Sequence, residues 1–424
     1  MKISIIGSGY VGVVTGACLS EFGHEIIFVD IDQRKIDLLN EGIPPIYELG
    51  LAEILEKNRS LISATDDYNS AIEDTDITFI SVGTPCAANG TIDTVYVKSA
   101  AENIGSALKN TSKKAVHTII VKSTVFPGTT ESVVLDALER TSGKKAGEGF
   151  YLGCNPEFLK EGVAVEDFMN PDRIVIGSYD EGAGEVLGSL YSDFDCPKVV
   201  TSIKTAEMIK YTSNAFLATK ISFANEIGNI CKNSGIDTEE VFKGVGLDAR
   251  INPSFFRSGI GFGGSCFPKD VRALLSGAME LGVDTTILRA VLDVNEAQPL
   301  KIVDLLKMHI PDLKGRKVGL LGLAFKPDTD DIRESRAIPV ISALSELGAE
   351  VVGYDPLASK NMSALFPDIR YAKDCGEVME CDAVLITTEW PEFESLDYSG
   401  KLVIDGRRIR KAAETAQTYE GVCW

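Results

Sequence analysis

Short, continuously apolar runs alternate with amphipathic stretches through the first half of this 424-residue chain. Runs that are apolar without alternation fit strands buried on both faces, and the helices between them cover a parallel sheet. The sequence therefore predicts a doubly wound, parallel α/β sheet. Strands are predicted at residues 3–6, 25–29, 77–82, 116–121, 150–154 and 172–176, and helices at 12–22, 34–40, 51–57, 95–108 and 130–140.

The second half begins with a long helical segment. Residues 205–233 contain no proline, and their apolar residues recur at helical spacing, which predicts one helix about 40 Å long. Further helices are predicted at 269–281, 286–308 and 338–347, and strands at 317–321, 350–354, 383–387 and 402–404. We therefore expect two Rossmann-like doubly wound domains joined by a long central helix, with boundaries at 1–200, 201–308 and 309–424.

Composition limits the partners of the chain. Lysine and arginine number 42 against 62 aspartates and glutamates, a net charge of −20, so no basic surface for nucleic acid or an anionic membrane is expected. No apolar run is long enough to span a bilayer, and the N-terminus enters a strand-and-turn pattern instead of a signal peptide. Nine cysteines without a Cys-x-x-Cys pair or zinc-type spacing predict reduced thiols and no metal site. We expect a cytoplasmic protein.

A glycine-rich turn follows the first predicted strand. Gly7, Gly9 and Gly12 form a Gly-x-Gly-x-x-Gly pattern at a strand–turn–helix junction. Such glycines let backbone N–H groups approach a pyrophosphate at the helix N-terminus. Asp30 ends the second predicted strand, where a carboxylate accepts hydrogen bonds from a ribose 2′-OH and repels a 2′-phosphate. Together these features predict a site for NAD in preference to NADP.

A second glycine-rich segment, residues 259–270, surrounds one cysteine. Its glycines leave room for a ligand at the backbone, and Cys266 precedes Lys269, Asp270 and a predicted helix. A thiol near a helix N-terminus and a lysine is expected to have a lowered pKa and greater thiolate character. The segment predicts that Cys266 is a nucleophile, whereas the other eight cysteines are predicted to be buried structural thiols.

Several other polar residues are candidate ligand contacts. Glu157 and Glu161 follow a strand end and would share one face if their segment is helical, and Lys210 and Asn214 have the same spacing on the long helix. Thr124, at the end of another strand, offers a hydroxyl to a cofactor. Cations in segments 325–335 and 405–408 suit a phosphorylated ligand. The three histidines have no partner in the sequence, so a catalytic histidine is not expected.

A nicotinamide site together with an activated thiol indicates oxidation through the aldehyde level. Hydride leaves an alcohol directly, whereas an aldehyde is oxidised most easily after a thiolate adds to it. The thiohemiacetal then loses a second hydride, and the thioester is hydrolysed. The residues alone leave two possibilities open: a two-step alcohol oxidation and a simple aldehyde dehydrogenase.

Six segments taken together resemble the UDP-glucose/GDP-mannose dehydrogenase family. They occur in order along the chain from residue 1 to about residue 410, and the glycine-rich cysteine segment is the most specific. The segments are Gly-Ser-Gly-Tyr-Val-Gly (7–12), Ser-Val-Gly-Thr-Pro (81–85), Ser-Thr-Val (123–125), Asn-Pro-Glu-Phe-Leu-Lys-Glu (155–161), Gly-Phe-Gly-Gly-Ser-Cys-Phe-Pro-Lys-Asp (261–270) and Phe-Lys-Pro-Asp-Thr-Asp-Asp-Ile-Arg-Glu-Ser (325–335).

The resemblance implies a four-electron oxidation of a sugar-nucleotide C6 alcohol to a carboxylate with two NAD. The implied catalytic residues are Cys266 as nucleophile, Lys210 and Asn214 around the reacting oxygen, and Asp270, Thr124 and Glu161 around a water. The implied NAD contacts are Gly7, Gly9, Tyr10, Val11, Gly12, Asp30, Lys35, Thr84, Thr124, Glu161, Lys269 and Arg333. The implied sugar-nucleotide contacts are Glu157, Phe158, Leu159, Lys160, Glu161, Lys210, Asn214, Arg250, Phe255, Phe256, Arg257, Ser258, Gly259, Gly263, Lys326 and Arg407.

Sequence features divide between two branches of this family. Residues 248–251 resemble the UDP-glucose branch, and the residues beside Cys266 differ from the histidine typical of UDP-N-acetylmannosamine dehydrogenases. Residues 155–161 and 420–424 resemble GDP-mannose enzymes, which share Gly-Gly-Ser-Cys. UDP-glucose is the predicted substrate; GDP-mannose, another UDP-sugar and a catalytically silent nucleotide-sugar sensor are the alternatives. Because the long helix builds a dimer core in this family, the resemblance also implies a homodimer in which Arg250 reaches a neighbouring subunit's substrate.

Overall fold

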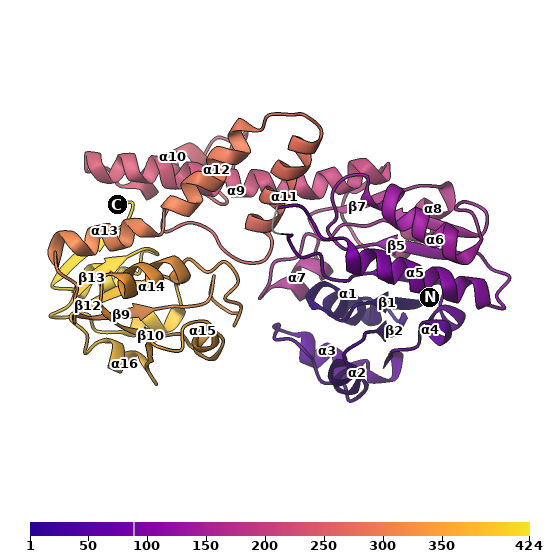
Figure 1. Ribbon diagram of the computed structural model, residues 1–424, viewed down its shortest axis with the longest axis horizontal. Coiled ribbons are helices and arrows are strands. Elements are labelled where there is room, and N and C mark those ends of the chain that lie inside the picture. The colour runs from indigo at the N-terminus through magenta and orange to yellow at the C-terminus, as the bar shows by residue number, and fades with distance from the viewer. Residues whose placement is uncertain (88–89) are drawn as a thin grey trace. The chain divides into compact units, whose positions relative to one another are not determined.

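The computed structural model describes residues 1–87 and 90–424 (Figure 1). The chain divides into two compact units, Met1–Thr212 and Ser213–Trp424, each containing one β-sheet. Helix α9 (Ile203–Ser234) crosses the boundary between the units and is a single uninterrupted helix, as the sequence predicts. Aspartate side chains cap helix starts in both units, at Asp32, Asp180 and Asp237, by accepting a hydrogen bond from a first-turn N–H.

In the described residues, the first sheet has eight strands in the order β3-β2-β1-β4-β5-β6-β7-β8. The strands are β1 (Lys2–Ile6), β2 (Glu25–Val29), β3 (Ile62–Thr65), β4 (Ile77–Ile80), β5 (His117–Val121), β6 (Phe150–Cys154), β7 (Ile174–Ser178) and β8 (Lys198–Thr201). The helices are α1 (Tyr10–Glu21), α2 (Gln33–Asn40), α3 (Leu51–Lys57), α4 (Tyr68–Asp74), α5 (Val95–Asn110), α6 (Leu135–Ser142), α7 (Ala164–Met169) and α8 (Glu181–Leu190). A 3₁₀ turn spans Arg59–Leu61, and a π-helical turn, Thr130–Val134, leads into α6.

The expectation of an entirely parallel first sheet is wrong at one position, because β6 and β7 pair antiparallel. The connection between them carries only the six-residue helix α7, which packs against α1. A parallel return needs a crossover that carries the chain back to the starting edge, usually along a longer helix. Since α7 does not make that crossover, the chain re-enters the sheet from the edge at which β6 ends.

Apolar residues of the first sheet fill a core on each face. Ile3 and Ile5 of β1 belong to the cluster that includes α1 and α3, whereas Ile6 belongs to the cluster that includes α5 and α6. Every residue of β4 and β5 is buried, as expected for strands covered on both sides. The first sheet is therefore doubly wound.

The second sheet has six described strands, all parallel, in the order β11-β10-β9-β12-β13-β14. They are β9 (Lys317–Leu321), β10 (Glu350–Tyr354), β11 (Arg370–Tyr371), β12 (Ala383–Ile386), β13 (Leu402–Asp405) and β14 (Thr418–Gly421). The helices of this unit are α10 (Thr238–Gly246), α11 (Phe267–Glu280), α12 (Thr286–Ala297), α13 (Leu300–His309), α14 (Ala337–Glu346), α15 (Ser359–Leu365), α16 (Cys375–Val378) and α17 (Arg410–Thr415), with a 3₁₀ turn at Pro391–Ser395. The prediction of two Rossmann-like sheets joined by a long helix is confirmed.

The predicted continuous helix at 286–308 is wrong. Helix α12 ends at Ala297 and α13 begins at Leu300, with Pro299 between them. Proline has no N–H to donate and its ring crowds the preceding helical turn, so it starts a new helix instead of continuing the old one.

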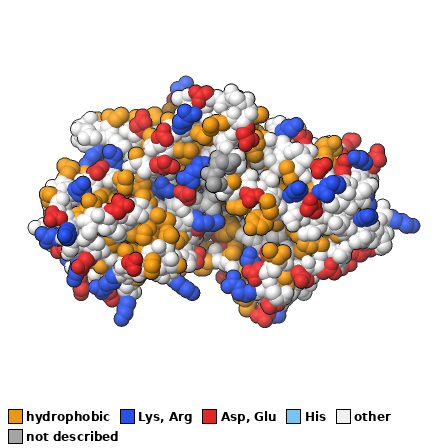
Figure 2. All heavy atoms as spheres, viewed as in Figure 1, with side chains coloured by type: hydrophobic (Ala, Val, Ile, Leu, Met, Phe, Trp, Pro, Cys, Tyr) orange, Lys and Arg blue, Asp and Glu red, His pale blue; other side chains and the backbone are white. Residues whose placement is uncertain are grey.

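In both sheets the strand order reverses beside the first strand, at the β1–β4 and β9–β12 neighbours. The carboxyl ends of such strands border the crevice where ligands bind in this architecture. On the face shown in Figure 2, acidic and basic side chains are interspersed. Among the described helices, none combines the length and the apolar character needed to cross a membrane.

Candidate active site

The turn after β1 contains two glycines that the fold requires and one that it does not. Gly7 has a φ of +97°, and a Cβ atom at Gly12 would lie 2.0 Å from the carbonyl oxygen of Gly7. Gly9 has an ordinary φ of −77°, and nothing lies within 4 Å of a Cβ placed there. Since α1 begins at Tyr10, the absence of a side chain at Gly9 keeps the helix N-terminus open to a phosphate.

Asp30 lies directly after β2 and faces this turn. Its Oδ2 accepts hydrogen bonds from Ser8 N at 2.7 Å and Ser8 Oγ at 2.5 Å, and its Oδ1 accepts one from Asp32 N at 3.0 Å. Lys35 Nζ lies 3.9 Å away. Burial alone would raise the pKa of Asp30, but these hydrogen bonds hold it below its usual value. A partly exposed, ionised acceptor at this position fits a ribose diol, so the residues present suit NAD.

Tyr10, a predicted NAD contact, turns its hydroxyl toward Glu48, and the two side chains are hydrogen-bonded. Glu48 also accepts hydrogen bonds from Gly162 N and Ala164 N, both at 2.7 Å. This acid therefore ties the glycine turn to the segment that follows β6. Sequence reasoning missed Glu48 because it lies between predicted helices and no motif marks it.

Glu157 does not share a helix face with Glu161, because residues 155–160 form no helix. Glu157 is buried and forms an ion pair with Lys210 Nζ at 2.8 Å, while Leu159 N donates to its carboxylate at 2.6 Å. Burial by itself raises the pKa of Glu157, but the charge and hydrogen bond of Lys210, the Leu159 N–H and the charge of Lys122 together lower it below its usual value. The first unit therefore holds a buried ion pair between two predicted site residues.

A second buried cation, Lys122, lies close to this pair and was missed by the sequence reasoning. It directly follows β5, and its Nζ donates to Asn155 Oδ1 at 2.9 Å, which also accepts a hydrogen bond from Tyr191 OH at 2.7 Å. Burial lowers the pKa of Lys122 to about 8. A lone lysine directly after the apolar run Ile119–Val121 is the signal that could have identified it.

Cys266 is half-buried at the N-cap of α11, and its Sγ lies 3.6 Å from Ser265 Oγ. One helical turn later, Asp270 is only 1% exposed. Its carboxylate accepts hydrogen bonds from Asn214 Nδ2 at 2.6 Å and Lys269 Nζ at 2.5 Å. In the second unit, the structure thus brings together three of the predicted site residues, Asn214, Lys269 and Asp270, beside the helix that Cys266 begins.

Cations gather at the carboxyl edge of the second sheet. Arg407 follows β13, donates from Nε to Thr387 O at 2.8 Å and lies 3.4 Å from Glu389, which is 3.7 Å from Arg257. In the loop after β9, which spans residues 322–336, Lys326 Nζ lies 5.5 Å from the centre of the Phe325 ring. Arg333, in the same loop, binds Asp331 at 2.7 Å. These cations suit a phosphorylated ligand.

Comparison with known proteins decides the family. The sequence matches the UDP-glucose/GDP-mannose dehydrogenase family in three successive segments: the NAD binding domain over residues 1–195, the central domain over 204–297 and the UDP binding domain over 319–412. The chain belongs to this family. The predicted NAD-dependent oxidoreductase is thereby confirmed.

Similar proteins extend over nearly the whole chain. UDP-glucose 6-dehydrogenase AglM of Haloferax volcanii is 47% identical over 421 residues, covering 96% of this chain and 97% of its own. GDP-mannose 6-dehydrogenase of Pseudomonas aeruginosa is 41% identical over 443 residues, covering all of both chains. A UDP-glucose dehydrogenase structure from Pyrobaculum islandicum matches with a TM-score of 0.96 and 46% identity, covering 100% of this chain and 98% of that one.

Other predicted contacts of this dehydrogenase already have protein partners. Phe256 stacks on Phe242 with ring centres 4.8 Å apart, and the Phe255 ring lies 6.2 Å from that of Phe267. The exposed Arg250 forms an ion pair with Asp248 at 2.6 Å. The N–H of Gly259 donates to Asn225 Oδ1 at 2.8 Å, and the neighbouring Ser258 is half-buried.

In the first unit, the remaining predicted contacts are divided between the surface and the site. Lys160 is exposed and forms an ion pair with Asp167 at 2.9 Å, whereas the Arg173 guanidinium lies 3.7 Å from the centre of the Phe158 ring. Thr124 follows β5, and it and Thr84 are half-buried. The side chain of Lys160, a predicted sugar-nucleotide contact, therefore lies at the surface and is paired with Asp167.

Two expectations about cysteine and histidine were incorrect. Of the eight cysteines besides Cys266, Cys86 is exposed and Cys196 is half-buried; only the other six are buried. The histidines do have partners: His117 Nε2 lies 2.6 Å from Thr78 Oγ1, and His309 Nε2 lies 3.6 Å from Glu420. These partners are distant in sequence, so only the folded chain brings them together.

Proposed function

We propose that this dehydrogenase oxidises the C6 alcohol of UDP-glucose to the carboxylate and reduces two NAD. The observation that carries the proposal is the thiol of Cys266 at the start of α11, one turn before the buried Asp270–Asn214–Lys269 cluster. The UDP binding domain match and the 47% identity to a UDP-glucose 6-dehydrogenase support this sugar nucleotide. The reduced cysteines suit a cytoplasmic enzyme.

The first segment, residues 1–200, is assigned to NAD, 201–308 to the central helical part and 309–424 to the sugar nucleotide. The open approach at Gly9 and the acceptor Asp30 fit the pyrophosphate and the ribose. Lys35, Thr84, Thr124, Glu161, Lys269 and Arg333 are the further NAD contacts proposed. When bound, NAD supplies the hydride acceptor for both oxidations.

In the first oxidation, Lys210 and Asn214 hold the C6 oxygen. They lie one helical turn apart on α9, so both present polar groups on the same side of the helix. The ammonium of Lys210 stabilises negative charge on that oxygen as its proton leaves to water. Glu157 keeps the ammonium in place through their ion pair. The products of this step are the aldehyde, one hydride and one proton.

In the second oxidation, the Cys266 thiolate adds to the aldehyde carbon, and the carbonyl electron pair moves to oxygen. Loss of hydride from the same carbon re-forms the carbonyl as a thioester. Water then adds to the thioester and the thiolate leaves, which releases the carboxylate. Asp270, together with Thr124 and Glu161, orders this water and accepts its proton.

The sugar nucleotide is assigned to residues 255–259, Gly263, Lys326 and Arg407. The two cations provide charge for the diphosphate at the carboxyl edge of the second sheet. Arg407 is already ordered by Thr387 and Glu389, so it needs little rearrangement to bind an anion.

A homodimer through α9 is part of the proposal. Phe216, Phe223 and Ile230 recur every seven residues along this helix and are 63%, 50% and 57% exposed. An exposed apolar stripe on one helix face is typical of an interface. The exposed Arg250 is assigned to a neighbouring subunit's substrate. Light scattering of Phe223→Glu should give the monomer mass if the stripe forms the dimer.

The deciding experiment supplies limiting UDP-glucose with excess NAD and counts NADH per sugar consumed. Two per sugar is expected, because both oxidations occur. One per sugar would show that the reaction stops at the aldehyde and that Cys266 forms no thioester. Cys266→Ser should form no carboxylate. GDP-mannose is assayed in parallel. Activity with GDP-mannose alone would show that UDP-glucose is not the substrate and would leave the two-step mechanism unchanged.

A further inference from the structure

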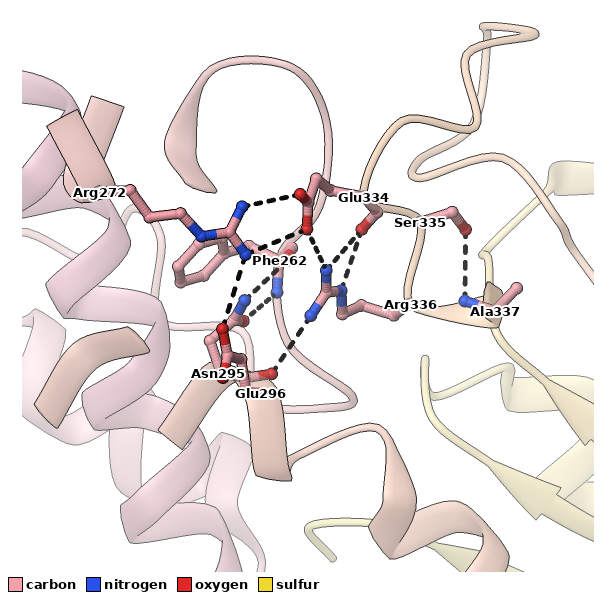
Figure 3. Close-up of polar contacts among 8 residues, drawn as sticks. All are labelled: Phe262, Arg272, Asn295, Glu296, Glu334, Ser335, Arg336 and Ala337. Atoms are coloured by element: carbon pink, nitrogen blue, oxygen red, sulfur yellow. Dashed lines mark hydrogen bonds and ion pairs between the residues drawn. The ribbon is translucent and has the colours of Figure 1, made fainter. Parts of the chain in front are cut away.

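A charged cluster in the second unit joins the cysteine segment to the loop after β9. It consists of Arg272 on α11, Asn295 on α12, and Glu334 and Arg336 at the end of the 322–336 loop (Figure 3). The proposed function assigns no role to these four residues. Two of the elements they connect carry assigned residues, Cys266 on one side and Lys326 on the other.

Glu334 is at the centre of the cluster. Its carboxylate binds Arg272 through two contacts, Nη1 at 2.7 Å and Nη2 at 3.4 Å, and binds Arg336 Nη2 at 3.2 Å. Its carbonyl oxygen accepts hydrogen bonds from Arg336 Nε at 3.0 Å and Nη2 at 2.8 Å. Glu334 has a φ of +54°, a region that side-chain-bearing residues rarely adopt. The two arginines therefore hold this residue in an uncommon conformation.

The backbone of the cysteine segment rests directly on Glu334. Gly264 N donates to Arg333 O at 2.9 Å, and a Cβ atom at Gly263 would lie 2.3 Å from Glu334 O. Only glycine allows the two chains to come this close. The last backbone units before Ser265 and Cys266 are thus pressed against the end of the 322–336 loop.

Asn295 holds the backbone of Phe262, the residue that precedes Gly263. Its Oδ1 accepts a hydrogen bond from Phe262 N at 2.7 Å, and its Nδ2 donates to Phe262 O at 3.0 Å, so one buried amide satisfies both backbone groups. Arg336 Nη1 donates to Asn295 O at 3.4 Å and connects this amide to Glu334. The segment is therefore fixed from Phe262 to Gly264, and Arg272 fixes the helix that follows.

We propose that Glu334 is a positioning residue for the thiol step, because it holds Cys266 at a constant place relative to the loop that carries Lys326. The inference rests on the proposed two-step oxidation. Removal of hydride from the alcohol requires no attack by sulfur, so the first oxidation depends less on this link. Attack of the thiolate on the aldehyde carbon depends on alignment, and a displacement of about 1 Å can slow such a step on the order of 100-fold.

The test is Glu334→Gln, which keeps the side-chain size and removes the charge. UDP-glucose is limiting, NAD is in excess, and semicarbazide traps any aldehyde that leaves the enzyme, with products identified by mass spectrometry. The expected result is fewer than two NADH per sugar together with trapped aldehyde. Arg272→Met, which breaks the same link, should do the same, and Glu334→Asp should restore part of the wild-type ratio.

The NADH-to-sugar ratio separates positioning from stability, because a smaller folded fraction lowers the rate and leaves the ratio unchanged. The matched control is Glu377→Gln, which removes an ion pair with Arg370 in the same unit; Glu377 is 26% exposed and Glu334 38%. This control should keep two NADH per sugar. A Glu334→Gln enzyme that still gives two, with no trapped aldehyde, overturns the inference. A wild-type ratio of one overturns the proposed function, and this inference with it.

Discussion

The two sheets begin in the same way and then use equivalent positions differently. The first strand of each is followed directly by a glycine with positive φ, Gly7 at +97° and Gly322 at +95°. Each glycine N–H donates at 2.8 Å to the neighbouring strand, at Val29 O and Tyr354 O. After Gly7 the helix starts at Tyr10, whereas after Gly322 the next helix starts only at Ala337. The long second loop is where Lys326, Arg333 and Glu334 lie.

The acid after the second strand shows the same contrast. Asp30 in the first sheet is partly exposed and accepts hydrogen bonds mainly from the turn itself. Its counterpart Asp355, after β10, is buried and accepts hydrogen bonds from Leu323 N, Ala324 N, Leu357 N, Ala358 N and Trp390 Nε1 at 2.7–3.0 Å. Asp30 therefore remains accessible to a ligand, whereas Asp355 stabilises the loops around it by accepting their hydrogen bonds. Equal topology therefore does not give equal binding chemistry.

The largest change in the free energy of unfolding should appear when Asp355 is removed, and removal of Asp30 is the comparison. Asp355→Ala leaves five donors, four of them on buried residues, without their acceptor and should lower the free energy of unfolding of the second unit by about 4 kcal/mol. Asp30→Ala should cost about 1 kcal/mol and mainly raise the KM for NAD. Tryptophan fluorescence reports the first effect, because both tryptophans, Trp390 and Trp424, lie in that unit. If both variants lost the same free energy of unfolding, the proposed difference between the two acids would be wrong.

Buried charges at the end of the fifth strand should give opposite pH dependence in the two sheets. Burial lowers the pKa of Lys122 from 10.5 to about 8 and raises that of Asp405, at the end of β13, from 3.8 to about 6. The folded state binds fewer protons than the unfolded state at Lys122 between pH 8 and 10.5, so stability rises with pH in that window. At Asp405 the folded state binds more protons between pH 3.8 and 6, so stability falls as pH rises there.

Urea denaturation across pH measures both effects against Lys122→Met and Asp405→Asn. Each difference from the wild type should change by about 3 kcal/mol through its own window and stay flat outside it. A flat difference for Lys122→Met between pH 8 and 10.5 would show that this lysine is solvated in solution.

The smallest effect on stability should come from Gly9. Gly9→Ala meets no atom within 4 Å and should change the free energy of unfolding by less than about 0.5 kcal/mol. Its methyl group occupies the approach to α1, so the affinity for NAD should fall about tenfold, or about 1.4 kcal/mol. Gly188→Ala in α8, also free of clashes, is the control and should leave NAD binding unchanged. Calorimetric titration with NAD distinguishes the two.

Much of the fold was predictable because it depends on local patterns. Continuous apolar runs identified β1, β2, β4, β5 and β6 in the first sheet and β9, β10, β12 and β13 in the second, and helical spacing identified α9. The strand predicted at 172–176 corresponds to β7, but its antiparallel direction was not predicted, and the short β3, β8, β11 and β14 were missed. Short edge strands carry little apolar signal, and the direction of a strand depends on how its connection packs.

The sequence by itself determined the two Rossmann-like sheets, the NAD turn at Gly7–Gly12, the acceptor Asp30 and the cysteine at the start of a helix. Each of these features can be predicted from a local pattern: apolar runs that alternate with helical stretches, the spacing of the glycines, or one residue type at the end of a strand or the start of a helix. Tertiary structure alone decided the Glu157–Lys210 ion pair, the burial of Lys122 and the contact of Glu334 with Arg272. Those pairings join residues 53 and 62 positions apart, or depend on burial by several elements, so no local pattern encodes them.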